Sequence, residues 1–447
     1  MRLSRRINAK ETQNNGVSPK PDTLGEKYNT VKSKIHLSLV DRLDLTTVTD
    51  LSSEELAGTI RSILNEITAM ESIPLNLKER STLISELIYE ITGFGPLQTL
   101  LEDESVQDIL VNGYSQVMVE REGLLYPTGV RFRDDRHLMH IIDKIVSSVG
   151  RRVDEASPMV DARLPDGSRV NVIIPPLALD GPMLSIRKFG TTRITGIHLL
   201  EKKALSPAMM TFLNAAIRAK LNILISGGTG AGKTTLLNVL SENIPENERI
   251  ITIEDSAELQ LHQTHVVRLE SRPPNIEGKG QVRLSDLVKN SLRMRPDRII
   301  VGESRGAEVI DMLQAMNTGH PGSMSTVHAN SPMDALTRLE VMATMGDITF
   351  NENALRTLVS RAIHLIVHIT RLNDGTRRIT HISEISGIRE GAIALTTVFA
   401  LERTGTDTHQ KTSGVFKGLG RIPNAVEHIR LSGISLDPDM FKDVTEI

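Results

Sequence analysis

One segment of this sequence constrains the fold more than any other. The apolar run of residues 223–226 is typical of a buried strand, and residues 236–240 are suited to a helix. The loop between them matches the pattern G-x-x-x-x-G-K-[ST]. It consists of Gly227, Gly228, Thr229, Gly230, Ala231, Gly232, Lys233, Thr234 and Thr235. A strand, a glycine-rich loop and a helix in this order predict an α/β domain.

The chemistry of this loop predicts a nucleoside triphosphate site. Because glycines let successive backbone N–H groups converge, the loop and the helix that follows it suit phosphate oxygens. Lys233 is expected to reach the β- and γ-phosphates, and the hydroxyl of Thr234 is expected to bind Mg²⁺. The alternative is a glycine-rich turn without a ligand. The loop alone does not distinguish a kinase, a GTPase, a transporter and a motor.

Acidic residues follow two later apolar segments. Residues 249–255 form a strand-like run that includes Glu254, and Glu258 comes soon after it. Residues 298–303 form another run and end in Glu303, which has the place and chemistry of a Walker B acid. Carboxylates at the carboxyl ends of parallel strands lie beside the nucleotide in such a sheet. Each acid alone could also be a solvated loop carboxylate.

A histidine and a group of arginines are less specific signals. His328 lies near the end of the apolar segment 322–329, before Ser331 and Pro332, which predict a helix start. Its imidazole is either a sensor of the γ-phosphate or a structural residue. The arginines near residues 283–298 are either arginine fingers or a solvated basic face. They are Arg283, Arg293, Arg295 and Arg298.

The rest of the chain divides by composition and periodicity. Residues 1–30 are polar and basic, which predicts a disordered tail that either increases solubility or contacts anionic lipid or a partner. Residues 31–104 show apolar side chains at three- and four-residue spacing, such as Leu56 and Ile60, which predicts helices. Alternating segments and Gly-containing turns over residues 105–200 predict a mixed α+β domain.

Overall composition excludes several classes of protein. The chain has 52 Lys and Arg against 55 Asp and Glu, a formal net charge of −3, so no global field favours nucleic acid. It has no cysteine, which excludes disulfides, thiol catalysis and cysteine-ligated metals and is consistent with a cytoplasmic location. The sequence contains no apolar run of about 18 residues, so it predicts no transmembrane segment. Membrane association is therefore expected through partners or at the periphery.

These motifs together resemble a known superfamily. The loop 227–235, the acidic segment 253–259, the segment 295–303 and His328 resemble the type II/IV secretion system ATPases, which include GspE-like and PilT-like proteins. Within it, the chain is most similar to the CpaF family of Flp (tight adherence) pilus assembly ATPases. The segments that carry this finer likeness are 91–97, 111–113, 185–189, 311–320 and 329–332.

The resemblance implies an architecture and a function. It implies a RecA-like P-loop NTPase domain over residues 201–447, preceded by a PAS-like α+β domain over 105–200 and a small N-terminal helical region over 31–104. It further implies a homo-hexamer that binds ATP and Mg²⁺ and hydrolyses ATP to drive pilus assembly or protein secretion. The partners would be inner-membrane platform proteins, so the cytoplasmic chain would associate peripherally with the inner membrane.

The resemblance also implies roles for site residues. Glu258 is expected to be the general base, and Glu303 is expected to organise Mg²⁺ through water. The division of roles among these two acids and Glu254 stays open. Arg187 is expected to approach the phosphates from the N-terminal domain, and Arg305 follows the Walker B acid in the family manner. His328 takes the place of the family histidine.

Two other classes of function are compatible with a RecA-like core. One is a motor that translocates nucleic acid, although the near-neutral charge and the 3% of aromatic residues argue against a base-stacking surface. The other is an ATP-dependent scaffold without turnover, against which the acids Glu258 and Glu303 argue. The guanine-reading motif N-K-x-D and the transporter signature L-S-G-G-Q do not occur in the sequence.

Overall fold

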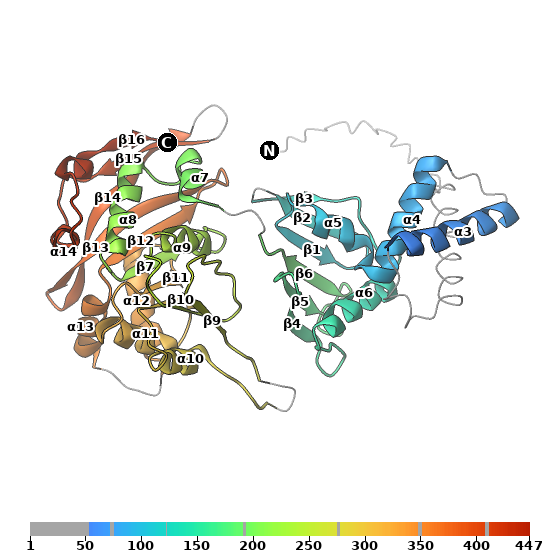
Figure 1. The fold of residues 1–447 in the computed structure, drawn as a ribbon, viewed down its shortest axis with the longest axis horizontal. Helices are drawn as coiled ribbons and strands as arrows, with labels where there is room; N and C mark the ends of the chain where they lie inside the picture. Colours follow the sequence, from blue (N-terminus) through green and yellow to red (C-terminus); the bar gives the residue numbers. More distant parts are fainter. Residues whose placement is uncertain are drawn as a thin grey trace, which may run out of the picture.

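A computed structural model describes most of the chain after residue 52. The described ranges are 53–71, 76–121, 123–190, 194–274, 278–346, 351–406 and 411–447. Their elements are shown in sequence colours in Figure 1. The tail expected at residues 1–30 lies outside the described residues. No helix within these ranges has both the length and the apolar character needed to cross a membrane.

Helices open the described chain. They are α3 (Ser53–Glu71), α4 (Leu77–Thr92), the 3-10 turn η1 (Gly95–Leu97) and α5 (Gln98–Glu102). A capping box begins α4, because the Asn76 side chain accepts a hydrogen bond from the N–H of Glu79 and the Glu79 carboxylate accepts one from the N–H of Asn76. Leu56 and Ile60 of α3 pack against Leu83 of α4 in one buried cluster. The helix predicted from their spacing is confirmed.

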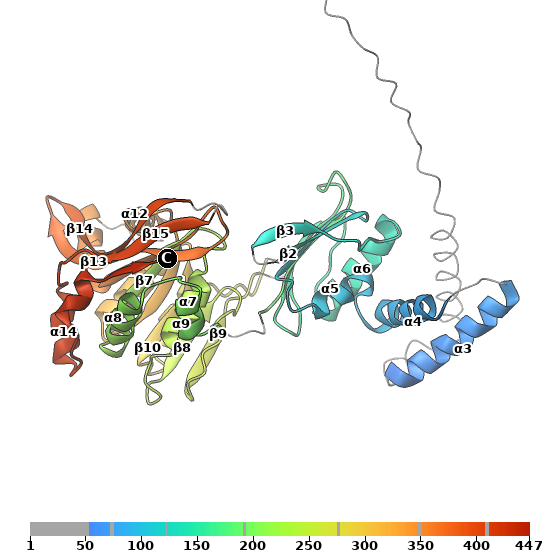
Figure 2. The same ribbon diagram turned by 90° about the horizontal axis from the view of Figure 1, so that it is seen from above.

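An antiparallel sheet follows these helices. Its strands are β1 (Asp108–Asn112), β2 (Gln116–Arg121), β3 (Leu124–Pro127), β4 (Met159–Arg163), β5 (Arg169–Ile173) and β6 (Met183–Arg187), in the order β3-β2-β1-β6-β5-β4. Ile109 and Val119 pair across β1 and β2, and both are fully buried. Helix α6 (Asp135–Ser148) covers the same apolar face with Ile141 and Ile145. Figure 2 shows α5 and α6 on one side of this sheet.

A larger mixed sheet forms the second half of the chain. Its parallel part has the order β9 (Val266–Glu270), β8 (Ile250–Glu254), β10 (Arg298–Ser304), β11 (Met324–His328), β7 (Ile223–Gly227) and β12 (Leu365–Arg371). Its antiparallel part continues with β13 (Arg377–Arg389), β14 (Ala392–Thr406), β15 (Thr412–Gly418) and β16 (Val444–Glu446). Ile223 and Ile225 of β7 face one buried cluster and Leu224 faces another. Both faces of this strand are therefore covered, as is typical of parallel sheets.

Helices cover the two faces of the larger sheet. The cluster on one face includes side chains of α7 (Gly196–Glu201), α8 (Pro207–Arg218), α9 (Lys233–Ser241), α14 (Ala425–Leu431) and the 3-10 turn η2 (Pro438–Lys442). The cluster on the other face includes α10 (Leu284–Ser291), α11 (Glu308–Asn317), α12 (Pro332–Ala343) and α13 (Glu352–Ala362). As predicted, α12 begins with Ser331 as N-cap and Pro332 as first residue. The predicted α/β fold with a RecA-like parallel core is confirmed.

The structure corrects the interpretation of Arg298. This residue is neither solvated nor available as an arginine finger, because its side chain is fully buried at the amino end of β10. Its Nε lies 2.6 Å and its Nη2 3.1 Å from the two carboxylate oxygens of Glu248, and its Nη1 donates to the carbonyl of Gly322. The glycine-rich loop lies at the opposite, carboxyl ends of these parallel strands. Arg298 is therefore a structural residue of the sheet.

Candidate active site

The glycine-rich loop joins β7 to α9 at the carboxyl end of the central strands. Gly230 and Gly232 have φ angles of 67° and 96°, in the left-handed region that residues with a Cβ rarely adopt. Gly232 is the N-cap of α9, and Lys233 is the first residue of that helix. The local sequence therefore builds the strand, loop and helix N-terminus that bind phosphate in other proteins.

Lys233, Glu303 and Arg305 form a row of charges beside the loop. The Nζ of Lys233 lies 3.6 Å from Oε1 of Glu303, and it also donates to the carbonyls of Gly227 at 3.2 Å and Gly228 at 3.3 Å. The Nε of Arg305 donates to Oε2 of Glu303 at 2.9 Å. Glu303 therefore lies between the lysine of the loop and Arg305.

Burial and charge act in opposite directions on these groups. Burial lowers the pKa of Lys233, and the carboxylate of Glu303 acts against this. Burial also acts to raise the pKa of Glu303, but the hydrogen bond from Arg305 and the charge of Lys233 together hold that pKa below its usual value. Glu303 is therefore a carboxylate anion at neutral pH, as metal binding requires.

His328 and Thr234 lie at opposite ends of the loop. His328 is the last residue of β11 and pairs in register with Gly227, the last residue of β7. The N–H of Ala329 donates to the carbonyl of Gly227 at 3.3 Å, so the end of β11 is tied to the start of the loop. Thr234 lies in the first turn of α9, and its hydroxyl has no hydrogen-bond partner among the described residues.

Glu254 positions the segment that carries Glu258. It is the last residue of β8 and only 3% exposed. Its Oε2 accepts hydrogen bonds from the N–H of Glu258 at 2.7 Å and of Leu259 at 2.9 Å. Burial raises the pKa of Glu254, and these two N–H groups act against the rise. The other oxygen, Oε1, is buried without a hydrogen-bond partner among the described residues.

Comparison with known proteins places this chain in a family. The profile of the family described as "Type II/IV secretion system protein" matches residues 90–414, which include both sheets up to β15. The chain belongs to this family.

Individual members of the Type II/IV secretion family cover most of the same region. A putative conjugal transfer protein of Mycobacterium tuberculosis is 36% identical over 324 residues, which are 71% of this chain and 91% of that protein. A type IV secretion system protein VirB11 of Bartonella quintana is 30% identical over 329 residues, 65% of this chain and 92% of that protein. Among solved structures, the VirB11 ATPase of Brucella suis in complex with sulphate is 28% identical, with a TM-score of 0.36, over 65% of this chain and 95% of that chain.

In this member of the Type II/IV secretion family, the smaller sheet contacts the segment after β8 through Arg163. Its Nη1 donates to Oε2 of Glu270 and its Nη2 donates to the carbonyl of Ala257, each at 2.5 Å. The same oxygen of Glu270 accepts the N–H of Ala257 at 3.0 Å. Arg163 ends β4, and both acceptors belong to the larger sheet and its loop. One guanidinium therefore joins the two halves of the chain.

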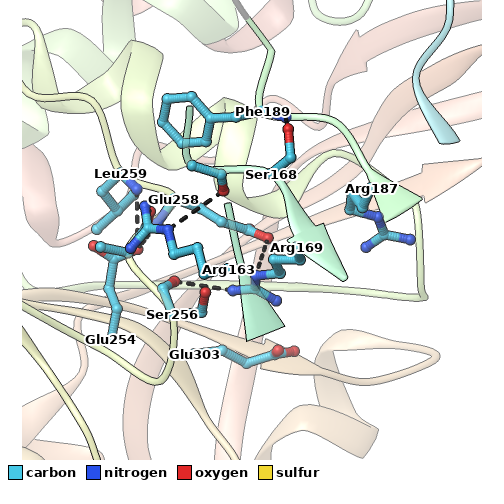
Figure 3. A network of polar contacts seen from close by, with 12 residues as sticks. Arg163, Ser168, Arg169, Arg187, Phe189, Glu254, Ser256, Glu258, Leu259 and Glu303 are labelled. Atoms are coloured by element: carbon cyan, nitrogen blue, oxygen red, sulfur yellow. Dashed lines mark hydrogen bonds and ion pairs between the residues drawn. The ribbon is translucent and has the colours of Figure 1, made fainter. Parts of the chain in front are cut away.

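Arg169 reaches Glu258 itself. The two arginines Arg163 and Arg169 lie directly opposite each other on β4 and β5. Arg169 donates from Nη2 to the carbonyl of Ser256 at 2.9 Å, and its Nε lies 3.1 Å from Oε1 of Glu258 without hydrogen-bond geometry. Figure 3 shows both guanidinium groups directed into the acidic segment. The expected general base thus has a counter-ion from the other sheet.

Sequence reasoning did not identify these two arginines. Both flank the turn that contains Asp166 and Gly167, which does predict a hairpin. The available sequence signal for their role was a pair of arginines, one on each side of the predicted hairpin turn. Nothing local to the hairpin indicates that its partners lie 87 to 107 residues further along the chain.

Arg187 makes its contacts elsewhere. It is the last residue of β6, and its Nε and Nη2 lie 3.1 Å and 3.3 Å from the two carboxylate oxygens of Asp108 on β1. The hydrogen bond with Asp108 raises the pKa of Arg187. Among the described residues it has no contact with the loop 227–235. Its approach to the phosphates stays a prediction, and Figure 3 shows it apart from the network of dashed lines around Glu258.

The residues at the loop fit ATP with Mg²⁺. The largely buried side chain of Lys233 and the N-terminus of α9 are suited to phosphate oxygens. Over the described ranges, no group of three or more His, Asp or Glu side chains is arranged to hold a metal ion by itself. Mg²⁺ here would be held by the free hydroxyl of Thr234 and by Glu303, with phosphate and water oxygens as the other ligands.

Proposed function

We propose that this chain is a secretion ATPase that hydrolyses ATP and transmits the resulting change of conformation to a membrane machine. The observation that carries this proposal is the row formed by Lys233, Glu303 and Arg305 beside an intact glycine-rich loop. A non-hydrolysing scaffold needs the loop but has no need of a carboxylate in contact with its lysine. Membership of the Type II/IV secretion family supports the same function.

Lys233 and three acidic residues have separate roles in the proposed reaction. Lys233 exchanges the carbonyls of Gly227 and Gly228 for the β- and γ-phosphates. Glu258 accepts a proton from the attacking water, and Glu303 orients that water. Bound Mg²⁺ would supply positive charge beside the phosphates. Glu254 acts through the two N–H groups that fix the position of Glu258. This division of roles makes Glu254 a positioning residue.

The remaining charged groups would act on the γ-phosphate. His328 lies beside the start of the loop and would sense the γ-phosphate. Arg305 and Arg187 would stabilise the charge that develops in the transition state, after Arg305 leaves Glu303 and Arg187 leaves Asp108. Both guanidinium groups are more than half exposed, at 63% and 57%, so burial does not hold either of them in its present ion pair.

The finer proposal concerns the machine that the ATPase serves. We propose that the chain is a CpaF-like ATPase that drives Flp or type IV-like pilus assembly or protein secretion. The segments 91–97, 111–113, 185–189, 311–320 and 329–332, which resemble that family, support this proposal. It would act as a homo-hexamer in the cytoplasm, at the inner membrane, with inner-membrane platform proteins as partners. In each subunit, a PAS-like domain of residues 105–200 and a RecA-like domain of residues 201–447 would enclose ATP.

The decisive experiment is phosphate release from the purified full chain with Mg²⁺ and ATP at several protein concentrations. Assembly mass is followed in parallel. We expect activity to rise as hexamers form and to fall about 100-fold or more in Lys233→Ala, Glu258→Gln and Glu303→Gln. The control is Glu402→Gln, an exposed residue of β14 that pairs with Lys417, for which activity should match wild type.

Different outcomes separate the parts of this proposal. Hydrolysis that is unchanged by Glu258→Gln would refute the assignment of the general base. ATP binding without any turnover in the wild type would refute independent hydrolysis and favour the scaffold. Because a similar protein is named as a putative conjugal transfer protein, a DNA-transfer machine is the second candidate. A strong rise of ATPase activity with single-stranded DNA would favour that candidate.

A further inference from the structure

A hairpin next to the glycine-rich loop carries two arginines that the proposed reaction does not use. Strand β12 pairs in parallel with β7, and Ile369 lies opposite Gly227. The hairpin of β12 and β13 therefore continues past the start of the loop, on the side away from β10 and Glu303. Arg371 ends β12, Arg377 begins β13, and the two lie directly opposite each other.

Both side chains contact the middle of the glycine-rich loop. The Nε of Arg377 donates to the carbonyl of Gly230 at 2.9 Å. A Cβ placed on Gly230 would lie 3.6 Å from Nη1 of Arg371, and a Cβ placed on Gly232 would lie 3.4 Å from Cδ of Arg377. Two guanidinium groups thus lie along one flank of the loop, opposite the flank that holds Glu303.

Arg371 also touches the other half of the chain. A Cβ placed on Gly123, in the turn between β2 and β3, would lie 2.8 Å from Nη2 of Arg371. The same guanidinium therefore extends from the loop to the smaller sheet. Gly123 has a φ of 84° and lacks the side chain that would displace this group.

Neither arginine forms an ion pair in the described part of the chain. Neither has a carboxylate within 4.0 Å there. The acid of the hairpin turn, Asp374, accepts hydrogen bonds from the N–H and hydroxyl of Thr376 and from the N–H of Thr412. Burial lowers the pKa of Arg377, the neighbouring charge of Arg371 lowers it further, and the charge of Glu120 acts against both. Two half-buried like charges in this arrangement are stabilised by an anion that binds between them.

We propose that Arg371 and Arg377 bind the phosphate chain of the nucleotide from the flank of the loop opposite Glu303. This inference rests on the proposed function, because it takes the loop 227–235 as the ATP site. A guanidinium presents several donors in a planar fork and binds phosphate oxygens well. Because Arg371 also touches Gly123, the pair would join the bound phosphate to the smaller sheet.

The test is calorimetric titration of the full chain with Mg²⁺ and the non-hydrolysable ATP analogue AMP-PNP. Arg371→Gln and Arg377→Gln remove one charge each and keep a polar side chain. We expect each to weaken AMP-PNP binding about tenfold or more, the usual effect of losing a charge-assisted hydrogen bond. Arg389→Gln is the matched control, since Arg389 is an exposed arginine at the far end of the same strand β13.

The variant Lys233→Ala separates the two proposals. If Lys233→Ala loses binding but Arg371→Gln and Arg377→Gln bind like Arg389→Gln, the hairpin inference is overturned and the proposed function stands. If Lys233→Ala binds AMP-PNP like the wild type, the proposed site itself is wrong. Should a Gln variant show no thermal unfolding transition, Arg371→Lys and Arg377→Lys replace it. Binding by both Lys variants as tight as that of the wild type would overturn the role of the planar fork.

Discussion

At the scale of the residue, position in the sheet decides what a charged side chain does. Glu303 and Glu254 each end a strand of the parallel sheet, yet Glu303 contacts Lys233 and Arg305 while Glu254 binds two backbone N–H groups. Arg298 begins one of the same strands and binds Glu248 at the opposite end of the sheet. Of these two strand-end carboxylates, Glu303 is therefore the one with charged neighbours beside the loop.

The buried pair of Arg298 and Glu248 gives a prediction for stability. Arg298→Met leaves the carboxylate of Glu248 buried, and its one remaining ion pair within the described ranges is with the partly exposed Lys220, at 3.6 Å. We expect a loss of about 3 kcal/mol in the free energy of unfolding, because an uncompensated buried charge is costly. Urea denaturation of the full chain measures this loss.

A double substitution is the control for this prediction. Arg298→Met combined with Glu248→Leu removes both charges, and we expect it to recover most of the stability. If the double variant is less stable than Arg298→Met, the loss arises from packing or from the bond to Gly322, and the uncompensated charge is not its cause.

At the scale of the element, β7 depends on its two neighbours to present the loop. His328 of β11 aligns with Gly227, and His368 of β12 aligns with Ser226. The Nδ1 of His368 forms a hydrogen bond of 2.8 Å with Oγ of Ser226, one residue before the loop begins. A buried imidazole thus supports the strand from which the loop starts.

This imidazole makes stability depend on pH. Burial, and secondarily the charge of His381, lowers the pKa of His368 to about 4. Between pH 6.5 and 4 the unfolded chain binds more protons at this residue, so the free energy of unfolding falls as the pH falls through that window. We expect His368 to account for about 2 kcal/mol of the loss between pH 7 and pH 5.

Urea denaturation at pH 5, 6 and 7 measures this effect. His368→Gln keeps a polar partner for Ser226, and it should show a smaller decrease in stability over the same range. His140→Gln, at an exposed position of α6, is the control. Equal pH dependence in the wild type and His368→Gln would contradict the prediction.

Many of the helices and strands around the site could be predicted from the sequence. The strands that contain residues 223, 250, 298 and 324, the loop, and the start of α12 follow from apolar runs, glycines and a Ser-Pro cap, which are local signals. Arg163, Arg169, Arg371 and Arg377 were not predicted as site residues. Each approaches the site from an element that is distant in sequence, and no local pattern shows which distant segments meet.

At the scale of the whole molecule, the smaller sheet contributes side chains to the acidic segment of the larger one. Arg163 binds Glu270 and the carbonyl of Ala257, and Arg169 lies beside Glu258. The expected general base therefore depends on both halves of the chain. Separation of the halves would remove its counter-ion.

Hydrogen exchange tests this dependence. The N–H of Ala257 donates to the same oxygen of Glu270 that Arg163 binds. We expect Arg163→Gln to increase exchange in residues 255–259 about tenfold, because the carboxylate loses the group that holds it in place. Arg152→Gln is the control, as Arg152 is 81% exposed and pairs with nearby Asp154. Equal exchange in Arg163→Gln and wild type would show that the contact does not restrain this segment.

The matched positions of Arg163 and Arg169 restrict how this protein can vary in length. Surface turns usually tolerate insertions. One residue inserted into 164–168 would shift the register of β4 and β5, and one of the two arginines would turn to the other face of the sheet. We therefore expect family members that share the acidic segment to keep this turn at constant length. Chimeras that exchange one half of the chain should work only when the hairpin and the acidic segment come from the same parent.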